Sequence, residues 1–161
     1  LKTIKKGTNV EQMRKFAKNA KLARLMVHGD FIIGLPGETK ESIQMTKDLI
    51  YDLKPELLQV LVPQPIPGTE LYAQCKKEGY LLIDDPTQYL DDNGHQKIIL
   101  SYPDMNVKEM GYEASRILRG YYLSPGYLSC VIRQIFRKNS LDEIKRLWTS
   151  TKMFLKFMST E

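Results

Sequence analysis

Cysteine is scarce in this chain of 161 residues, which contains only Cys75 and Cys130. Two cysteines so far apart cannot form a CxxxCxxC cluster motif, a cysteine zinc site or a disulfide framework. The sequence therefore predicts two reduced thiols, as is typical of a cytoplasmic protein, with Cys75 buried in a helix.

Long apolar runs are also missing. No run reaches the roughly 18 residues that a membrane-spanning helix needs, and no secretory signal, internal repeat or low-complexity segment is visible. With 42% apolar residues, the composition is that of an ordinary globular protein. Because the chain begins at Leu1 instead of methionine, we expect that an upstream part of the protein is missing from this sequence.

Charge is unevenly distributed along the chain. Residues 1–106 hold 14 basic and 14 acidic side chains, whereas residues 107–161 hold 10 basic and 5 acidic ones. The whole net charge of +5 therefore lies in the C-terminal third. A basic helical tail of this kind can bind nucleic acid, anionic lipid or an acidic domain, but most such faces are simply solvated.

The most informative stretch is residues 29–39, GDFIIGLPGET. Phe31, Ile32 and Ile33 are apolar without alternation, which predicts a strand buried on both faces of a parallel sheet. The strand ends at a glycine-rich turn, and Thr39 can then cap a helix. Strand, glycine turn and helix start are where α/β proteins usually bind a ligand.

The surrounding sequence predicts an α/β protein with a helical tail. A capping box of Thr8 and Glu11 opens a helix that ends near residue 24, and a strand follows at residues 25–33. A helix at 40–53, a strand at 57–62 and a short helix at 70–78 come next, so the strands should be parallel. Further strands are expected from residues 81–83 and 97–101 or from the missing part. Helices are expected at 107–123, at 127–138 and from Ser140 onward.

Two motifs carry a resemblance to a known family. The segment MVHGDFIIGLPGET at 26–39, followed by PGTELY at 67–72, resembles the second half of a radical S-adenosylmethionine (SAM) domain. It is most similar to the subgroup with an N-terminal cobalamin-binding domain, such as anaerobic magnesium-protoporphyrin ester cyclases and hopanoid-biosynthesis proteins. The resemblance implies the C-terminal half of a partial (β/α) TIM-like barrel at 1–80, a connection at 81–106 and an all-helical extension at 107–161.

The resemblance also implies an activity for the parent enzyme. In the family, three closely spaced cysteines hold a 4Fe–4S cluster that cleaves S-adenosylmethionine to a 5′-deoxyadenosyl radical. The radical then drives oxidation, cyclisation or, with cobalamin, methyl transfer on a small organic or lipid-like substrate. Those cysteines are absent here, so we expect the missing N-terminal half to bind the cluster and any cobalamin. This chain, with no catalytic residue or metal ligand of its own, should be inactive alone.

Candidate cofactor and substrate residues follow from the same resemblance. Ile32 would pack on the adenine ring, Gly34 would clear space for it, and Val62 would contact it through the backbone. The turn adds Pro36 and Glu38. The loop after the second strand would face the substrate, through Pro65, Gly68 and Thr69.

The chain departs from the family motif GxIxGxxE at two positions. Asp30 replaces the first glycine, and Glu38 lies four residues after Gly34 instead of three. The glutamate's role in this chain is therefore open, and a plain strand-to-helix turn is the alternative interpretation of the whole stretch.

Other polar residues have two interpretations each. His28 could contact a ligand, but a hydrogen-bonded structural role is the more common fate of a lone histidine, and His95 is expected in solvent. The acidic residues at 84–92 lack the spacing and closing glutamate of a calcium loop.

The tail combines aromatic and basic side chains, which leaves rival functions open. The set could bind nucleic acid or a membrane surface, but we prefer a helical cap that packs on the barrel, because no RNA-recognition motif is present. Another rival is a radical SAM methylthiotransferase acting on RNA or a ribosomal protein, which would end in a small β-barrel. The set comprises Arg116, Arg119, Tyr121, Tyr122, Tyr127, Arg133, Arg137, Lys138 and Trp148.

Overall fold

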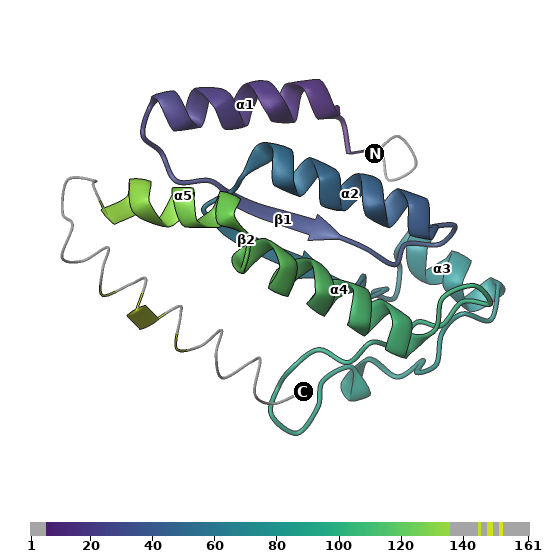
Figure 1. Cartoon of the computed structure of the whole chain (residues 1–161). Helices are drawn as coiled ribbons and strands as arrows, with labels where there is room; N and C mark the ends of the chain where they lie inside the picture. Colours follow the sequence, from purple (N-terminus) through teal and green to yellow (C-terminus); the bar gives the residue numbers. More distant parts are fainter. Residues whose placement is uncertain (1–5, 136–144, 146–147, 150–151, 153–161) are drawn as a thin grey trace.

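The computed structural model describes residues 6–135, 145, 148–149 and 152 (Figure 1). Its elements follow the predicted order of helix, strand, helix, strand and further helices. The helix predicted from Ser140 onward lies outside the described residues, apart from isolated positions. The elements are α1 (Val10–Leu22), β1 (His28–Ile32), α2 (Lys40–Leu53), β2 (Leu57–Leu61), α3 (Glu70–Lys77), a 3-10 turn (Pro86–Gln88), α4 (Val107–Tyr122) and α5 (Pro125–Ile135).

The two strands form a parallel sheet, as the order of elements predicts. His28 lies opposite Leu57 and Ile32 lies opposite Leu61. The additional strands expected at 81–83 and 97–101 do not form in the described residues. An isolated antiparallel bridge between Leu81 and Leu100 replaces them. Two strands do not define a barrel, so the partial (β/α) barrel remains a prediction.

Only one face of the sheet is covered by the described helices. Phe31, Leu58 and Val60 pack into a core to which α2 and α4 contribute their apolar faces. The prediction that β1 is buried on both faces is wrong, since its residues alternate in exposure and Ile32 is 44% exposed. The physical reason is that no described element packs on the second face. The apolar run 31–33 continues into a fully buried Ile33 just beyond the strand.

The helix starts show how local chemistry sets the boundaries. Thr39 caps α2 as predicted, and its side chain accepts a hydrogen bond from the Ser42 amide. At α1 the predicted cap Thr8 is wrong by one residue. Asn9 is the cap, because its side chain and that of Gln12 form a reciprocal capping box.

The helical tail packs on the segment that leads into β2. The hydroxyl of Tyr121 donates to the carbonyl of Pro55, and that of Tyr127 lies 3.5 Å from the carbonyl of Glu56. These contacts favour the packing interpretation of the tail's aromatic residues. Arg116 forms an ion pair with Glu113. The side chains of residues 133, 137 and 138 lie outside the described part, as do most of the residues around the exposed Trp148.

Among the described residues, no helix has the length and apolar character needed to cross a membrane.

Candidate functional site at the strand ends

The carboxyl ends of β1 and β2 lie side by side. The Ile33 amide donates to the Leu61 carbonyl at 2.9 Å. A Cβ atom on Gly34 would lie 3.5 Å from Val62 Cγ1. The structure therefore brings Gly34 and Val62 together, and Ile32 lies at the end of β1. The Val62 side chain packs against the core, whereas that of Ile32 is exposed. The resemblance assigns all three residues to one wall of a cofactor pocket.

Gly34 occupies a position that no other residue fits without strain. Its φ of +84° lies in the region that favours glycine, and a Cβ there would lie 2.7 Å from Met110 Sδ. The resemblance assigns this space to an adenine ring, which remains a prediction; in this structure Met110 of α4 occupies it.

Glu38 closes the turn on itself. Its carboxylate accepts hydrogen bonds from the Gly34 amide and from Ser42 Oγ, while its own amide donates to the Leu35 carbonyl at 3.0 Å. The four-residue spacing from Gly34 is what lets the carboxylate reach back to that amide. Glu38 is therefore a structural part of the turn, and Pro36 lies half-buried inside it.

The carbonyl of Gly34 also has a partner, since it accepts a hydrogen bond from the Tyr102 hydroxyl at 2.8 Å. Burial raises the pKa of Tyr102 well above its ordinary value, so the hydroxyl remains a donor. Both polar backbone groups of Gly34 are thus occupied by protein side chains. A ligand at this wall would have to take its backbone hydrogen bonds from other residues.

Ile32 is the residue of this set that offers open apolar surface. It lies on the uncovered face of the sheet, which His28, Asp30 and Gln59 share. His28 Nε2 lies 3.2 Å from Asp30 Oδ1, so the hydrogen-bonded role expected for this histidine has a partner. An exposed aliphatic side chain at a strand end fits the apolar platform that an adenine ring requires.

The loop after β2 is partly structural. Pro65 is fully buried, whereas Gly68 and Thr69 are exposed. Thr69 caps α3: its hydroxyl accepts from the Tyr72 amide at 3.2 Å and donates to the Ile66 carbonyl at 2.7 Å. The substrate contacts that the resemblance implies for Pro65, Gly68 and Thr69 remain predictions.

The remaining candidate ligand groups are the histidine, cysteine and acidic side chains. No set of three or more His, Cys, Asp or Glu side chains in the described ranges could hold a metal ion. Cys75 and Cys130 are both buried, and burial raises the pKa of the Cys75 thiol.

The acidic loop is held by local contacts. Lys76 Nζ lies 2.7 Å from Asp84 Oδ2, and the Tyr72 hydroxyl donates to the same carboxylate. Asp91 accepts the His95 amide at 2.8 Å and lies 3.3 Å from its ring. His95 is exposed, as expected, and its ring is also paired with Asp91.

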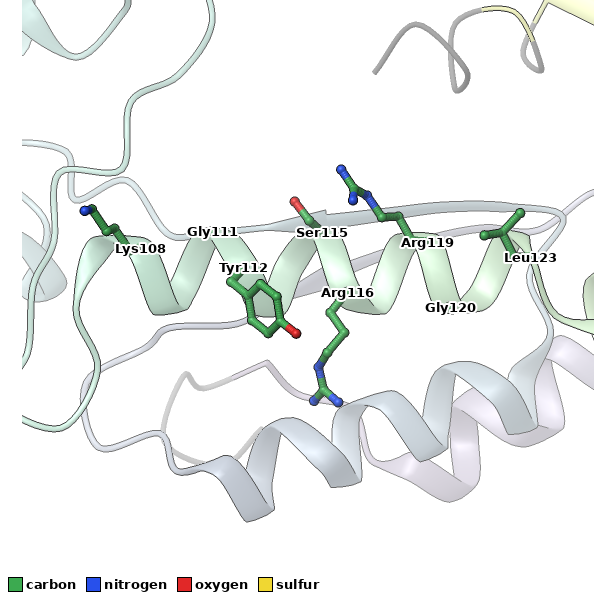
Figure 2. A pocket seen from close by; sticks show the side chains of 8 residues that line it. All are labelled: Lys108, Gly111, Tyr112, Ser115, Arg116, Arg119, Gly120 and Leu123. Atoms are coloured by element: carbon green, nitrogen blue, oxygen red, sulfur yellow. The ribbon is translucent and has the colours of Figure 1, made fainter. Parts of the chain in front are cut away.

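Sequence reasoning did not find a groove of about 600 Å³ that runs along α4 (Figure 2). Glycine and serine residues of α4 leave the groove open, and lysine and arginine side chains border it. This combination of small and basic residues on one helix could have indicated the groove from the sequence. Every lining residue belongs to α4 or its C-cap, so the groove follows one helix and shares no residue with the strand-end site. The lining residues are Lys108, Gly111, Tyr112, Ser115, Arg116, Arg119, Gly120 and Leu123.

Comparison with known proteins finds sequence similarity to proteins named as methyltransferases or methylthiotransferases. A Methanocaldococcus jannaschii protein named as a methylthiotransferase is 42% identical over 71 residues, which are 44% of this chain and 16% of that protein. The cytidylyl-2-hydroxyethylphosphonate methyltransferase of Streptomyces wedmorensis is 30% identical over 63% of this chain and 20% of its own length. An uncharacterized methyltransferase of Pyrococcus horikoshii is 30% identical over 77% of this chain and 25% of its own length.

The names of these relatives support a radical SAM family, at the level of methyltransferases and methylthiotransferases. They do not single out the cobalamin-binding cyclase subgroup. The chain spans a quarter or less of the length of these three relatives. No family model matches the chain, and no solved structure matches it significantly.

Proposed function

We propose that this chain is the C-terminal part of the catalytic barrel of a radical SAM enzyme that transfers a methyl or methylthio group. The observation that carries the proposal is the meeting of Gly34 and Val62 at adjacent strand ends beside the exposed Ile32. Parallel sheets bind their ligands at this edge. In the parent, these residues would form the adenine-side wall of the S-adenosylmethionine pocket.

The uncovered part of the sheet favours a missing N-terminal half as the partner. Within the described residues, β1 has no strand on the side away from β2, and one whole face carries no helix. A parallel sheet is normally covered on both faces. The preceding strands of a barrel would pair with β1 and would enclose His28, Asp30 and Ile32.

The cluster chemistry would come from that missing half. When bound there, a 4Fe–4S cluster supplies the electron that makes S-adenosylmethionine a radical source. This chain's own contribution would be positioning: Ile32 offers an apolar surface, and the Glu38 carboxylate and Tyr102 hydroxyl fix the turn next to it.

The helical extension favours the cobalamin-binding subgroup and a small organic or lipid-like substrate. The described chain continues after the sheet as the helices α4, which packs on β2, and α5, which packs on α4. A methylthiotransferase would instead end in a small β-barrel. Oxidation or cyclisation, the activities of the cyclases in this subgroup, is the finer alternative to methyl transfer.

A methylthiotransferase that modifies RNA or a ribosomal protein is the second candidate. The 42% identity to a protein of that name favours it. The two candidates differ at the C-terminus of the parent, so a small β-barrel domain after the described helices in the full-length protein would favour the methylthiotransferase.

The experiment uses the full-length parent. Three cysteines spaced CxxxCxxC upstream of residue 1, followed by formation of 5′-deoxyadenosine from S-adenosylmethionine after cluster reconstitution, would support the proposal. Absence of both would refute it. The 161-residue chain alone should form no 5′-deoxyadenosine, and detectable cleavage by it would contradict the division of roles proposed here.

A further inference from the structure

Tyr102 is joined to the strand-end site across 68 positions of sequence. Its hydroxyl donates to the Gly34 carbonyl at 2.8 Å. Its ring packs edge-to-face on Tyr80, with centroids 4.9 Å apart. Its backbone is fixed by reciprocal hydrogen bonds with Met105 at 3.0 and 3.2 Å. The position of the Tyr102 hydroxyl is therefore fixed by contacts other than its hydrogen bond to Gly34.

Three side chains hold Gly34, and two of them come from far along the chain. Glu38 bonds its amide, Tyr102 bonds its carbonyl, and Met110 Sδ fills the space where a Cβ would lie. We propose that Tyr102 is a positioning residue for the cofactor pocket, acting through Gly34 on the wall formed by Ile32 and Val62. This inference rests on the proposed function.

The hydroxyl, not the ring, is the part that matters. A phenylalanine at position 102 would fill the same volume and keep the contact with Tyr80, but the buried carbonyl of Gly34 would lose its donor. A buried acceptor without a partner is costly, so the turn would shift toward solvent to recover one. The shift would change where Ile32 and Val62 meet the adenine ring.

The first test examines the link itself in the 161-residue chain. The Gly34 carbonyl ¹³C resonance should move upfield in Tyr102→Phe and remain in place in Tyr80→Phe, a control that removes a hydroxyl from the same aromatic pair. Equal spectra for the two variants would overturn the proposal. If Tyr102→Phe does not fold, 3-fluorotyrosine at position 102 keeps the ring and makes a stronger donor, so the resonance should then move downfield. An unmoved resonance would again overturn the proposal.

The second test measures S-adenosylmethionine affinity in the reconstituted parent. Loss of one hydrogen bond should weaken binding about three- to tenfold in Tyr102→Phe, with unchanged iron content and a maximal rate within about twofold of wild type. Tyr80→Phe should bind like wild type. If both variants match wild type, the positioning role fails while the proposed function stands. If the wild-type parent does not bind S-adenosylmethionine, the proposed function fails as well.

Discussion

Tyr122 and Leu58 are joined by two hydrogen bonds through one hydroxyl group. The Leu58 amide donates to it at 2.9 Å, and the hydroxyl donates to the Leu58 carbonyl at 3.0 Å. Alternate residues of a strand direct their backbone groups to opposite edges, and Leu57 and Leu61 bond the β1 side. Tyr122 therefore covers the outer edge of β2, where an exposed edge would otherwise invite pairing with another strand.

Tyr122→Phe should destabilise the chain by about 1–3 kcal/mol, because both backbone groups of Leu58 lose a partner. Urea denaturation followed by circular dichroism measures the free energy of unfolding. The matched control is Tyr112→Phe, which removes a hydroxyl from an exposed tyrosine of the same helix and should change stability by less than about 0.5 kcal/mol. Equal effects of the two substitutions would refute the role of the Tyr122 hydroxyl.

Gly34→Ala should cost far more stability than Gly37→Ala. Both glycines have positive φ, +84° and +80°, so both variants carry the backbone strain of roughly 1–2 kcal/mol. Only at Gly34 does a Cβ meet Met110 Sδ at 2.7 Å, whereas Gly37 has nothing within 4 Å. Overpacking should therefore add about 1–3 kcal/mol.

A double-mutant cycle separates the two contributions at Gly34. In a Met110→Ala background, Gly34→Ala should cost no more than Gly37→Ala, because the clash has been removed while the strain remains. If the Gly34→Ala penalty is the same with methionine or alanine at position 110, the close packing described here is not its cause.

Ile32 and Ile33 should separate function from stability. Ile33 is fully buried, so Ile33→Ala should cost about 2–5 kcal/mol of unfolding free energy in the 161-residue chain. Ile32 is 44% exposed, and Ile32→Ala should cost about 1 kcal/mol or less. In the reconstituted parent, Ile32→Ala should nevertheless weaken S-adenosylmethionine binding. Unchanged affinity would remove Ile32 from the proposed wall.

The carboxyl pKa of Asp84 should lie below its ordinary value of 3.8. The largest cause is the hydrogen bond that the carboxylate accepts from Lys76, and the next is the one it accepts from Tyr72. The folded state then binds this proton less readily than the unfolded state. The resulting stabilisation is present above about pH 4 and is lost as the pH falls through the lowered pKa.

Carboxyl NMR titration tests this assignment. Lys76→Gln should raise the pKa of Asp84 toward its ordinary value. Lys77→Gln, a neighbouring exposed lysine, should leave the titration unchanged. If both substitutions, or neither, shift the pKa of Asp84, the direct contact with Lys76 is not what lowers it.

The sequence predicted the helices and strands better than it predicted their burial. Periodicity and caps were sufficient for α2 and its cap Thr39, because these depend on residues only three or four positions apart. The burial of β1 was predicted wrongly. An apolar run indicates a strand, but it does not show whether other elements cover one face of that strand or both. Asn9 displaced Thr8 as a cap because both residue types cap helices well and only geometry separates them.

The strand-end site was predicted only in part. The residues Ile32, Gly34 and Val62 could be proposed from the motif, and the structure places them at the ends of adjacent strands. The partners of Gly34 could not, since Tyr102 and Met110 lie far along the chain in segments without a motif. The role of Glu38 in closing the turn likewise required the position of its carboxylate relative to the Gly34 amide.

The most direct test of the central claim is photolabelling of the reconstituted parent with 8-azido-S-adenosylmethionine, followed by mass spectrometry of tryptic peptides. If these residues form the adenine-side wall, label within this chain should fall on peptide 25–40, which contains Ile32 and Gly34, or on peptide 48–76, which contains Val62. Unlabelled S-adenosylmethionine should compete it away. Label confined to other peptides, or no competed label in this chain, would contradict the account.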